Sequence, residues 1–187
     1  MGRRPKIDDA ELLSALSDAF RELGYAGTSV AMLAEATGLR KASLYHRFPG
    51  GKEQMAREVL GAAQTWLEEK ILRPLREPGS PRTRIAAMAE NLDRFYCGGR
   101  QACLLNMLAS PTLRNGPFAE PIKAAFEAWI AAMAGVVTDA GFDARTAEVR
   151  AEKAVAHLEG ALVLSRGMRT TAPFRRALDC LACDLLE

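Results

Sequence analysis

Basic side chains gather in one short stretch of a nearly neutral chain. The formal net charge of the 187 residues is only +2, yet residues 40–52 carry Arg40, Lys41, Arg47 and Lys52 with no carboxylate among them. Guanidinium and ammonium groups hold phosphates and can read guanine edges. Because attraction of a polyanion depends on the local potential, this cluster indicates a nucleic-acid contact although the total charge does not.

Three helical segments are expected to position this cluster. Apolar residues recur at three- and four-residue steps over 12–23, which is typical of a helix with one buried face. Thr28 or Ser29 can cap a short second helix, and Gly38 can supply a positive φ in the turn that follows it. A third short helix is expected over about 40–48. Two short helices joined by such a turn form a helix-turn-helix, whose second helix can lie in the major groove.

The run TSVAMLAEATGLRKASLYHRFPGGKE, residues 28–53, carries a specific resemblance. It resembles the DNA-binding signature of TetR-family regulators, above all in the LYHRF stretch at 44–48 followed by Lys52. The resemblance covers about residues 7–58, and the FPGGK stretch is similar to the LmrA- and YxaF-like branch. Arg40 departs from the family, which often has a Ser or Thr cap there. Without a Ser or Thr cap the helix loses about 1 kcal/mol of stability, and Arg40 is expected to add a cation that faces DNA.

The resemblance and the polar face of the third helix together predict double-stranded operator DNA as a partner. Lys52 is expected to share a phosphate with backbone N–H groups at the start of its helix. Arg3, Arg4 and Lys6 either add an arm along the DNA or form a solvated terminus. The predicted DNA-contacting residues are Thr28, Ser29, Arg40, Lys41, Ala42, Ser43, Tyr45, His46 and Lys52.

The whole chain is expected to be all-α, because no segment shows β-alternation. We predict about nine helices in two domains, a helix-turn-helix domain over 1–52 and a larger helical domain over 53–187. One helix is expected to run from Lys52 to about Leu72 and to stop near Pro74, before the linker at 77–81. The later helices are predicted over about 82–97, 101–109, 119–139, 145–167 and 172–186.

For the larger domain, the resemblance implies a homodimer. The two last helices carry small and apolar stripes that suit a two-fold, four-helix interface. The same stripes also suit packing against the core of a single subunit. The predicted interface residues are Ala154, Leu158, Ala161, Leu162, Ser165, Phe174, Leu178, Leu181 and Leu185.

The resemblance also implies a small-molecule effector. A pocket needs apolar walls and a few polar groups, and the low charge of the candidates predicts a largely apolar or aromatic ligand. Ordinary core packing is the alternative for each candidate. The candidates are Trp66, Phe95, Tyr96, Cys103, Met107, Phe126, Trp129, Met133 and His157.

The four cysteines are Cys97, Cys103, Cys180 and Cys183. They are expected to be free thiols, since no signal-peptide-type stretch indicates secretion. The last two form a CxxC pair on one helix face, which suits either close packing or a thiol-based redox sensor. Two thiols do not complete a tetrahedral zinc site, so no metal is expected.

These patterns favour a cytoplasmic regulator with no membrane partner and no cofactor. It is expected to be a homodimeric repressor that a ligand releases from a palindromic operator. The alternative is a DNA-binding regulator without an effector. An enzyme is not expected, because a phosphate-binding glycine loop, a nucleophile elbow and an HExxH helix are all missing from the sequence.

Overall fold

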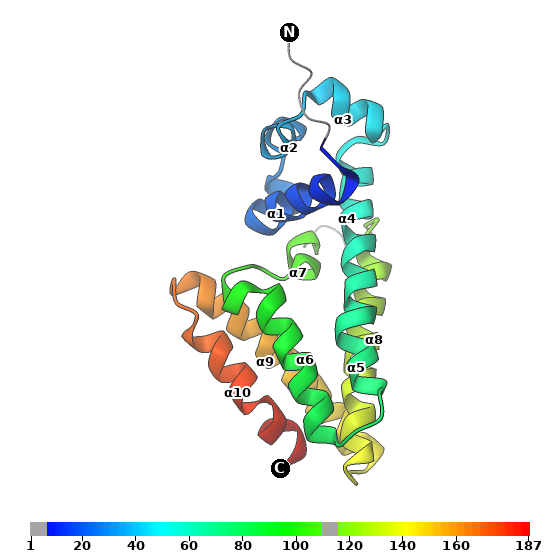
Figure 1. Cartoon of the computed structure of the whole chain (residues 1–187), viewed down its shortest axis with the longest axis vertical. Coiled ribbons are helices and arrows are strands. Elements are labelled where there is room, and N and C mark those ends of the chain that lie inside the picture. Colours follow the sequence, from blue (N-terminus) through cyan, green and yellow to red (C-terminus); the bar gives the residue numbers. More distant parts are fainter. Residues whose placement is uncertain (1–6, 110–115) are drawn as a thin grey trace. The chain divides into compact units, whose positions relative to one another are not determined.

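The computed structural model describes residues 7–109 and 116–187, and every regular element within these ranges is a helix (Figure 1). This confirms the all-α prediction. Arg3, Arg4 and Lys6 lie outside the described residues. The helices group into two compact units, Met1–Ala63 with Leu104–Ala119, and Gln64–Cys103 with Glu120–Glu187. The predicted boundary between residues 52 and 53 falls inside the first unit.

The first unit holds the predicted three-helix arrangement. It contains α1 (Asp9–Gly27), α2 (Val30–Thr37), α3 (Lys41–Arg47), most of α4 (Gly51–Leu67) and the short α7 (Leu104–Leu108). Its core contains the apolar residues that the helical periodicity selected, all of them fully buried: Leu16, Phe20, Leu33, Leu44 and Phe48. The stripe at 12–23 therefore folds as the sequence predicts.

Two caps set the ends of the first helices. Asp8 accepts a hydrogen bond from the backbone N–H of Glu11 at 2.7 Å and begins α1. Gly24, at φ 70°, interrupts the helical backbone near the predicted end, although α1 continues to Gly27. Of the two candidate caps for α2, Ser29 takes the role, because its hydroxyl accepts from the Met32 N–H at 3.3 Å.

The stretch after α4 corrects one prediction. The helix does not stop near Pro74 but continues through a π-helical turn (Glu68–Leu72) into α5 (Arg73–Arg76). Pro74 stands in the first turn of α5, where its missing N–H costs little, and the wider π turn precedes it. If α4, the π turn and α5 are counted as one helix, the described residues contain nine α-helices, as the sequence predicts.

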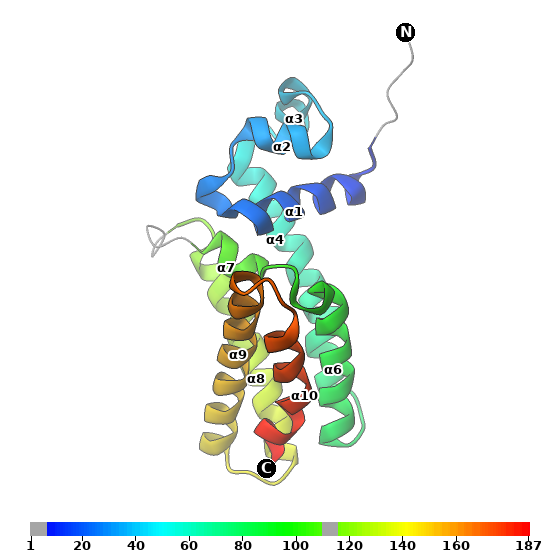
Figure 2. The ribbon, with the colours of Figure 1, turned by 90° about the vertical axis from the view of Figure 1, so that its left-hand side faces the viewer.

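The second unit is a bundle of long helices. It contains α6 (Pro81–Phe95), a 3₁₀ turn (Cys97–Gly99), α8 (Ala119–Asp139), α9 (Ala144–Gly167) and α10 (Ala172–Leu186). Figure 2 shows α6, α9 and α10 running alongside one another. The bounds of α8, α9 and α10 agree closely with the predicted ranges.

Helix starts and burial explain these bounds. Ser80 and Asp143 cap α6 and α9, and hydrogen bonds from Thr146 hold the pKa of Asp143 below its ordinary value. Helix α8 has the length and the apolar composition of a membrane-spanning helix, and buried core helices share both features. Its residues Trp129 and Met133 are buried in the unit, which explains the apolar composition of α8 as core packing.

Candidate nucleic-acid interface

Helix α3 turns a polar face outward from the first unit. Leu44 points into the core and is fully buried, whereas Tyr45 is 49% exposed. Arg40 is the N-cap residue, and its side chain makes no capping hydrogen bond, so the guanidinium is not used to begin the helix. The exposed predicted contacts on or beside α3 are Arg40, Lys41, Ala42, Ser43, Tyr45 and His46. The structure therefore brings these six residues together on one surface.

The turn at Gly38 sets the direction of α3. Its backbone is left-handed, with φ 65° and ψ 10°, and its N–H donates to the Glu35 carbonyl. A Cβ at this position would meet no atom within 4 Å. Glycine is favoured here by the backbone conformation and not by lack of space.

Arg47 is turned inward, unlike the other cations of α3. Its guanidinium contacts both carboxylate oxygens of Glu58, at 3.1 and 3.4 Å, and lies 3.5 Å from the Asp9 carboxylate. The hydrogen bond with Glu58 is the main cause that raises the pKa of Arg47. Gln54 donates to the same Glu58 and accepts from the Gly50 N–H, both at 2.9 Å. This group joins α3 to α1 and α4.

Lys52 is placed differently from the expected direct phosphate contact. Its ammonium donates to the carbonyl oxygens of Tyr25 and Thr28, both at 2.9 Å, and lies 4.3 Å from the centre of the Tyr25 ring. Two of its three donors are thus used within the unit. Burial, followed by the nearby Glu53 carboxylate, raises the pKa of Tyr25, so the phenol stays neutral. Lys52 fixes the connection between α1 and α2.

Thr28 also departs from the predicted role. It is only 2% exposed, and its hydroxyl donates to the Gly24 carbonyl at 2.6 Å. Its side chain closes the end of α1 and is not presented on the surface. Ser29 is exposed, but its hydroxyl already caps α2. Hydroxyl side chains at helix ends commonly satisfy backbone groups in this way.

The placement of Lys52 makes a testable prediction. Lys52→Met keeps an aliphatic chain but removes the ammonium hydrogen bonds to two carbonyls, so we expect the free energy of unfolding to fall by about 1–2 kcal/mol. Urea denaturation measures this change. A positioning role predicts that DNA binding weakens while its dependence on salt keeps the same slope. An unchanged stability with a slope lower by about one would instead restore the direct phosphate contact.

Part of the predicted effector set meets in the second unit. Trp66 stacks on Phe95, with ring centres 3.7 Å apart, and Phe95 meets Tyr96 edge-on at 5.0 Å. Tyr96 in turn contacts Phe174 at 5.7 Å. Cys103, Trp129 and Met133 are buried and Phe126 is partly buried. These residues form an apolar and aromatic part of the second unit.

Two members of the predicted effector set lie elsewhere. Met107 belongs to the first unit, where its side chain lies close to Gly24. His157 is exposed on α9, and its Nδ1 lies 3.6 Å from the Asp184 carboxylate. Neither Met107 nor His157 takes part in the aromatic contacts of the second unit.

The predicted dimer residues face the interior of their own subunit. Eight of the nine are buried in the single chain, including Ala154 at 4% exposure and Ser165 at 3%. Leu178 is half-buried and lines a groove between α6 and α10. The Ser165 hydroxyl accepts from the Phe174 N–H at 3.1 Å and so joins α9 to α10. In the single chain, these stripes therefore pack within one subunit, which is the alternative that the sequence left open.

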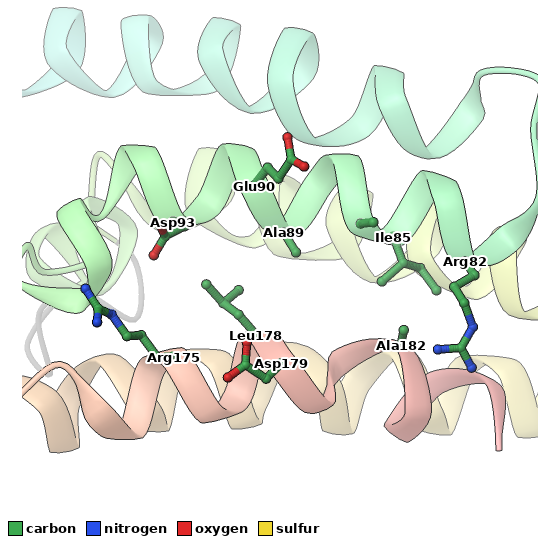
Figure 3. Close-up of a pocket in the computed structure, with 10 residues that line it drawn as sticks. Arg82, Ile85, Ala89, Glu90, Asp93, Arg175, Leu178, Asp179 and Ala182 are labelled. Atoms are coloured by element: carbon green, nitrogen blue, oxygen red, sulfur yellow. The ribbon is translucent and has the colours of Figure 1, made fainter.

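The groove between α6 and α10 gathers charged and small residues. Figure 3 shows Arg82 and Arg175 near its opposite ends, with Leu178 between them. None of the predicted effector residues lines it. The floor is built from alanines and from Ile85, while Glu90, Asp93 and Asp179 add negative charge. The groove is therefore a mixed surface and not the apolar pocket that the sequence predicted.

The cysteines are free thiols, and the CxxC pair is not packed. Cys103 is buried, but Cys97, Cys180 and Cys183 are exposed. Close packing of Cys180 and Cys183 was therefore the wrong interpretation. Interaction with the Cys183 sulfur, and then with the Glu187 carboxylate, raises the pKa of Arg82.

Comparison with known proteins connects this geometry to a family. A model of bacterial regulatory proteins of the tetR family matches residues 12–59. A model of the C-terminal domain of LmrA/YxaF-like transcriptional regulators matches residues 81–180. The HTH-type transcriptional regulator LmrA of Bacillus subtilis is 28% identical over 180 residues, which cover 95% of each chain. YxaF of the same organism is 26% identical and covers 87% of each chain.

Solved structures show the same fold. A TetR transcriptional regulator from Legionella pneumophila aligns with a TM-score of 0.81 at 20% identity, over 97% of this chain and 99% of that one. A cysteine mutant of the TetR regulator CifR, bound to a 26-base-pair double-stranded operator, aligns with a TM-score of 0.72 at 23% identity and 98% coverage of both chains. Both solved structures share the arrangement of helices seen in this chain. The chain belongs to the TetR family of DNA-binding transcriptional regulators, in its LmrA/YxaF-like branch.

Proposed function

We propose that the protein is a homodimeric repressor that a small, largely apolar ligand releases from a palindromic operator. The observation that carries the proposal is the exposed face of α3, where Arg40, Lys41, Ser43, Tyr45 and His46 lie together. The CifR relative binds a 26-base-pair operator, which exceeds two turns of DNA and accommodates two recognition helices. A dimer bound across a promoter blocks polymerase without needing an activating surface.

The outward side of α9 supplies a dimer face in place of the predicted stripes. Val163 and Leu164 are each 55% exposed, and Val149 is 43% exposed. The same side of α9 carries three small residues at helical spacing, Ala156, Gly160 and Gly167. Lys153 is the charged residue on this side. Contiguous exposed apolar residues mark interaction surfaces. Glycines let a second helix approach closely, and a Cβ at either position would meet nothing within 4 Å in the single chain.

This face suits a two-fold contact. In an isologous dimer the same patch serves both subunits, so one helical row is sufficient. The opposite side of α9 packs on α10, which leaves the pair free to meet its copy as a four-helix arrangement. The proposed interface therefore uses the predicted last two helices, but through the outward side of α9 instead of the predicted stripes.

An unpartnered buried donor supports the effector. The indole N–H of Trp129 is buried and has no hydrogen-bond acceptor among the described residues, although Trp129 is only 2% exposed. A buried N–H without an acceptor is costly, and a ligand that supplies one removes this cost. Together with the apolar surroundings in the second unit, this donor favours an aromatic or apolar ligand that carries a carbonyl or ether oxygen.

The proposed mechanism is a shift between two states. In the DNA-competent state the recognition helices of the dimer lie about 34–36 Å apart. The ligand binds more tightly to a state with another spacing, and operator affinity falls by the difference in binding free energy. Helix α4 is the proposed connector, because it begins beside α3 and continues past Ala63 into the second unit.

Transcription in vitro from a promoter that contains the operator tests this function. Purified protein is expected to lower the transcript level, and aromatic compounds that raise its melting temperature are expected to restore it. Trp129→Phe keeps an aromatic side chain and removes the N–H donor, so we expect the compound concentration needed for release to rise about tenfold. Operator affinity without compound should stay unchanged. Compounds that bind tightly without affecting transcription would contradict an effector-controlled repressor.

Thiol control is a second candidate, favoured by the exposed Cys183 beside Arg82. An exposed thiol is accessible to peroxide, which oxidises it to a sulfenic acid. Peroxide alone should then release the operator from the native chain but not from Cys183→Ser. Equal release from both proteins would exclude this candidate.

A further inference from the structure

We propose that the second unit carries an anion-binding site for a small molecule with a phosphate group, separate from the operator surface and from the apolar effector site. The site is a surface pocket of about 580 Å³, where α9 ends and α10 begins. It is lined by Gly99, Arg100, Ser165, Arg166, Arg169, Thr170 and Thr171. Nothing in the proposed repressor mechanism uses this pocket.

Three arginines from three segments supply its charge. Arg100 follows the 3₁₀ turn, Arg166 belongs to the last turn of α9, and Arg169 lies in the connection to α10. No carboxylate is among the described residues that line the pocket, whereas the α6–α10 groove includes Glu90, Asp93 and Asp179. Guanidinium groups bind phosphate through paired N–H donors.

The backbone at Arg169 adds an independent observation. Arg169 has φ 53°, in the left-handed region where glycine is preferred. The Thr170 N–H donates to the Ser165 carbonyl at 3.0 Å, and the Arg169 N–H donates to the Arg166 carbonyl at 3.2 Å. These two bonds form the Schellman ending of α9, in which position 169 is the usual place for glycine. Arg169 therefore lines the pocket although its backbone conformation favours glycine.

The pocket wall is held in place by close packing. A Cβ at Gly99 would lie 2.7 Å from the Phe174 Cβ, so only glycine allows the chain beside Arg100 to pass this close to α10. The Ser165 hydroxyl accepts from the Phe174 N–H at 3.1 Å, and the Thr170 hydroxyl accepts from the Ala172 N–H at 3.4 Å. These hydroxyls accept from the first turn of α10, and Arg100 and Arg169 add charged guanidinium donors for an anion.

The ligand class follows from charge and size. Three guanidinium groups suit a dianionic phosphate better than a single carboxylate, and the volume admits a small phosphate ester. The phosphates of the operator carry the same chemistry. We assign the site to a free small molecule, because the recognition face already described serves DNA through α3.

Inorganic phosphate and pyrophosphate test the site in the full-length protein at constant ionic strength set with sodium chloride. Titration calorimetry should show saturable binding, and both anions should raise the melting temperature above the value in chloride alone. Arg169→Gly should lower anion affinity about tenfold, while the melting temperature without anion stays the same or rises. Arg100→Gln should also weaken binding. Arg145→Gln, an exposed change of equal charge in the first turn of α9, should not.

Three results would overturn the proposal. If pyrophosphate binds no more strongly than chloride, the pocket is not a phosphate-binding site. A lower melting temperature of Arg169→Gly with unchanged anion affinity would leave these arginines only a structural role at the end of α9. A reduced salt slope of operator binding in Arg169→Gly and Arg100→Gln, again with unchanged anion affinity, would assign them to DNA.

Discussion

Arg40→Ala combined with Lys41→Ala should lower operator affinity at least about 100-fold. Each side chain stands on the exposed face of α3, and a specific contact to a base edge contributes about 1–3 kcal/mol. In a dimer the loss occurs twice. A fluorescence anisotropy titration at fixed salt measures the change, and the free energy of unfolding should stay the same because neither side chain is buried.

Arg57→Ala is the control for charge, and it matches the loss of one cation in Arg40→Ala or in Lys41→Ala alone. Arg57 is exposed on α4 and pairs with Glu53 at 2.7 Å, so its removal also lowers the positive charge of the first unit. Its effect on operator affinity should be within about threefold, since an exposed ion pair contributes little. Equal losses for this control and for the α3 variants would mean that only overall charge matters and that α3 has no special role.

Gly160→Arg should convert the proposed dimer into a folded monomer and lower operator affinity at least about 100-fold. A side chain at this position has open space in the single chain, and arginine favours a helix more than glycine does. In the proposed dimer the same side chain would enter the contact between two α9 helices, near Lys153. Losing the second recognition helix removes the gain from two-site binding, which reaches 10²–10⁴. The added cation can only increase general attraction to DNA, so charge does not explain a loss.

Gly135→Arg makes the same substitution on the exposed side of α8, where a Cβ also meets nothing within 4 Å. Sedimentation velocity should give this control and the native chain twice the 20.3 kDa chain mass, and Gly160→Arg a single mass. A dimeric Gly160→Arg protein with unchanged affinity would place the interface on another surface.

The sequence predicts the helices well because their signals are local. Ser80, Asp143 and Gly38 each act within one turn of the backbone, and the apolar period of 12–23 needs no knowledge of other segments. The exception in α4 has a local cause that propensity misses. A π turn before Pro74 lets the chain remain helical where a proline usually ends a helix.

The site is only partly predictable, because several of its partners are distant in sequence. Arg47 and Lys52 look alike as cations, yet Arg47 pairs with Glu58, and Lys52 binds the carbonyls of Tyr25 and Thr28. No spacing rule indicates these contacts.

The dimer face shows a second limit. An apolar stripe such as the one through Leu158 and Leu162 predicts burial but not which surface buries it, and here it is the subunit's own core. The opposite row at Ala156, Gly160 and Gly167 has little hydrophobic signal, because glycine and alanine are small. Only the exposure of Val163 and Leu164 beside these residues reveals the row.

Selection of bound sequences from a random DNA pool tests the central claim most directly. The native protein is expected to recover a palindrome whose half-sites are one or two helical turns apart, and Gly160→Arg is expected to recover at most a weak half-site. Arg40→Ala with Lys41→Ala should lose enrichment at defined positions within each half-site. A palindrome recovered equally well by all three proteins would contradict both the assigned recognition face and the assigned dimer face.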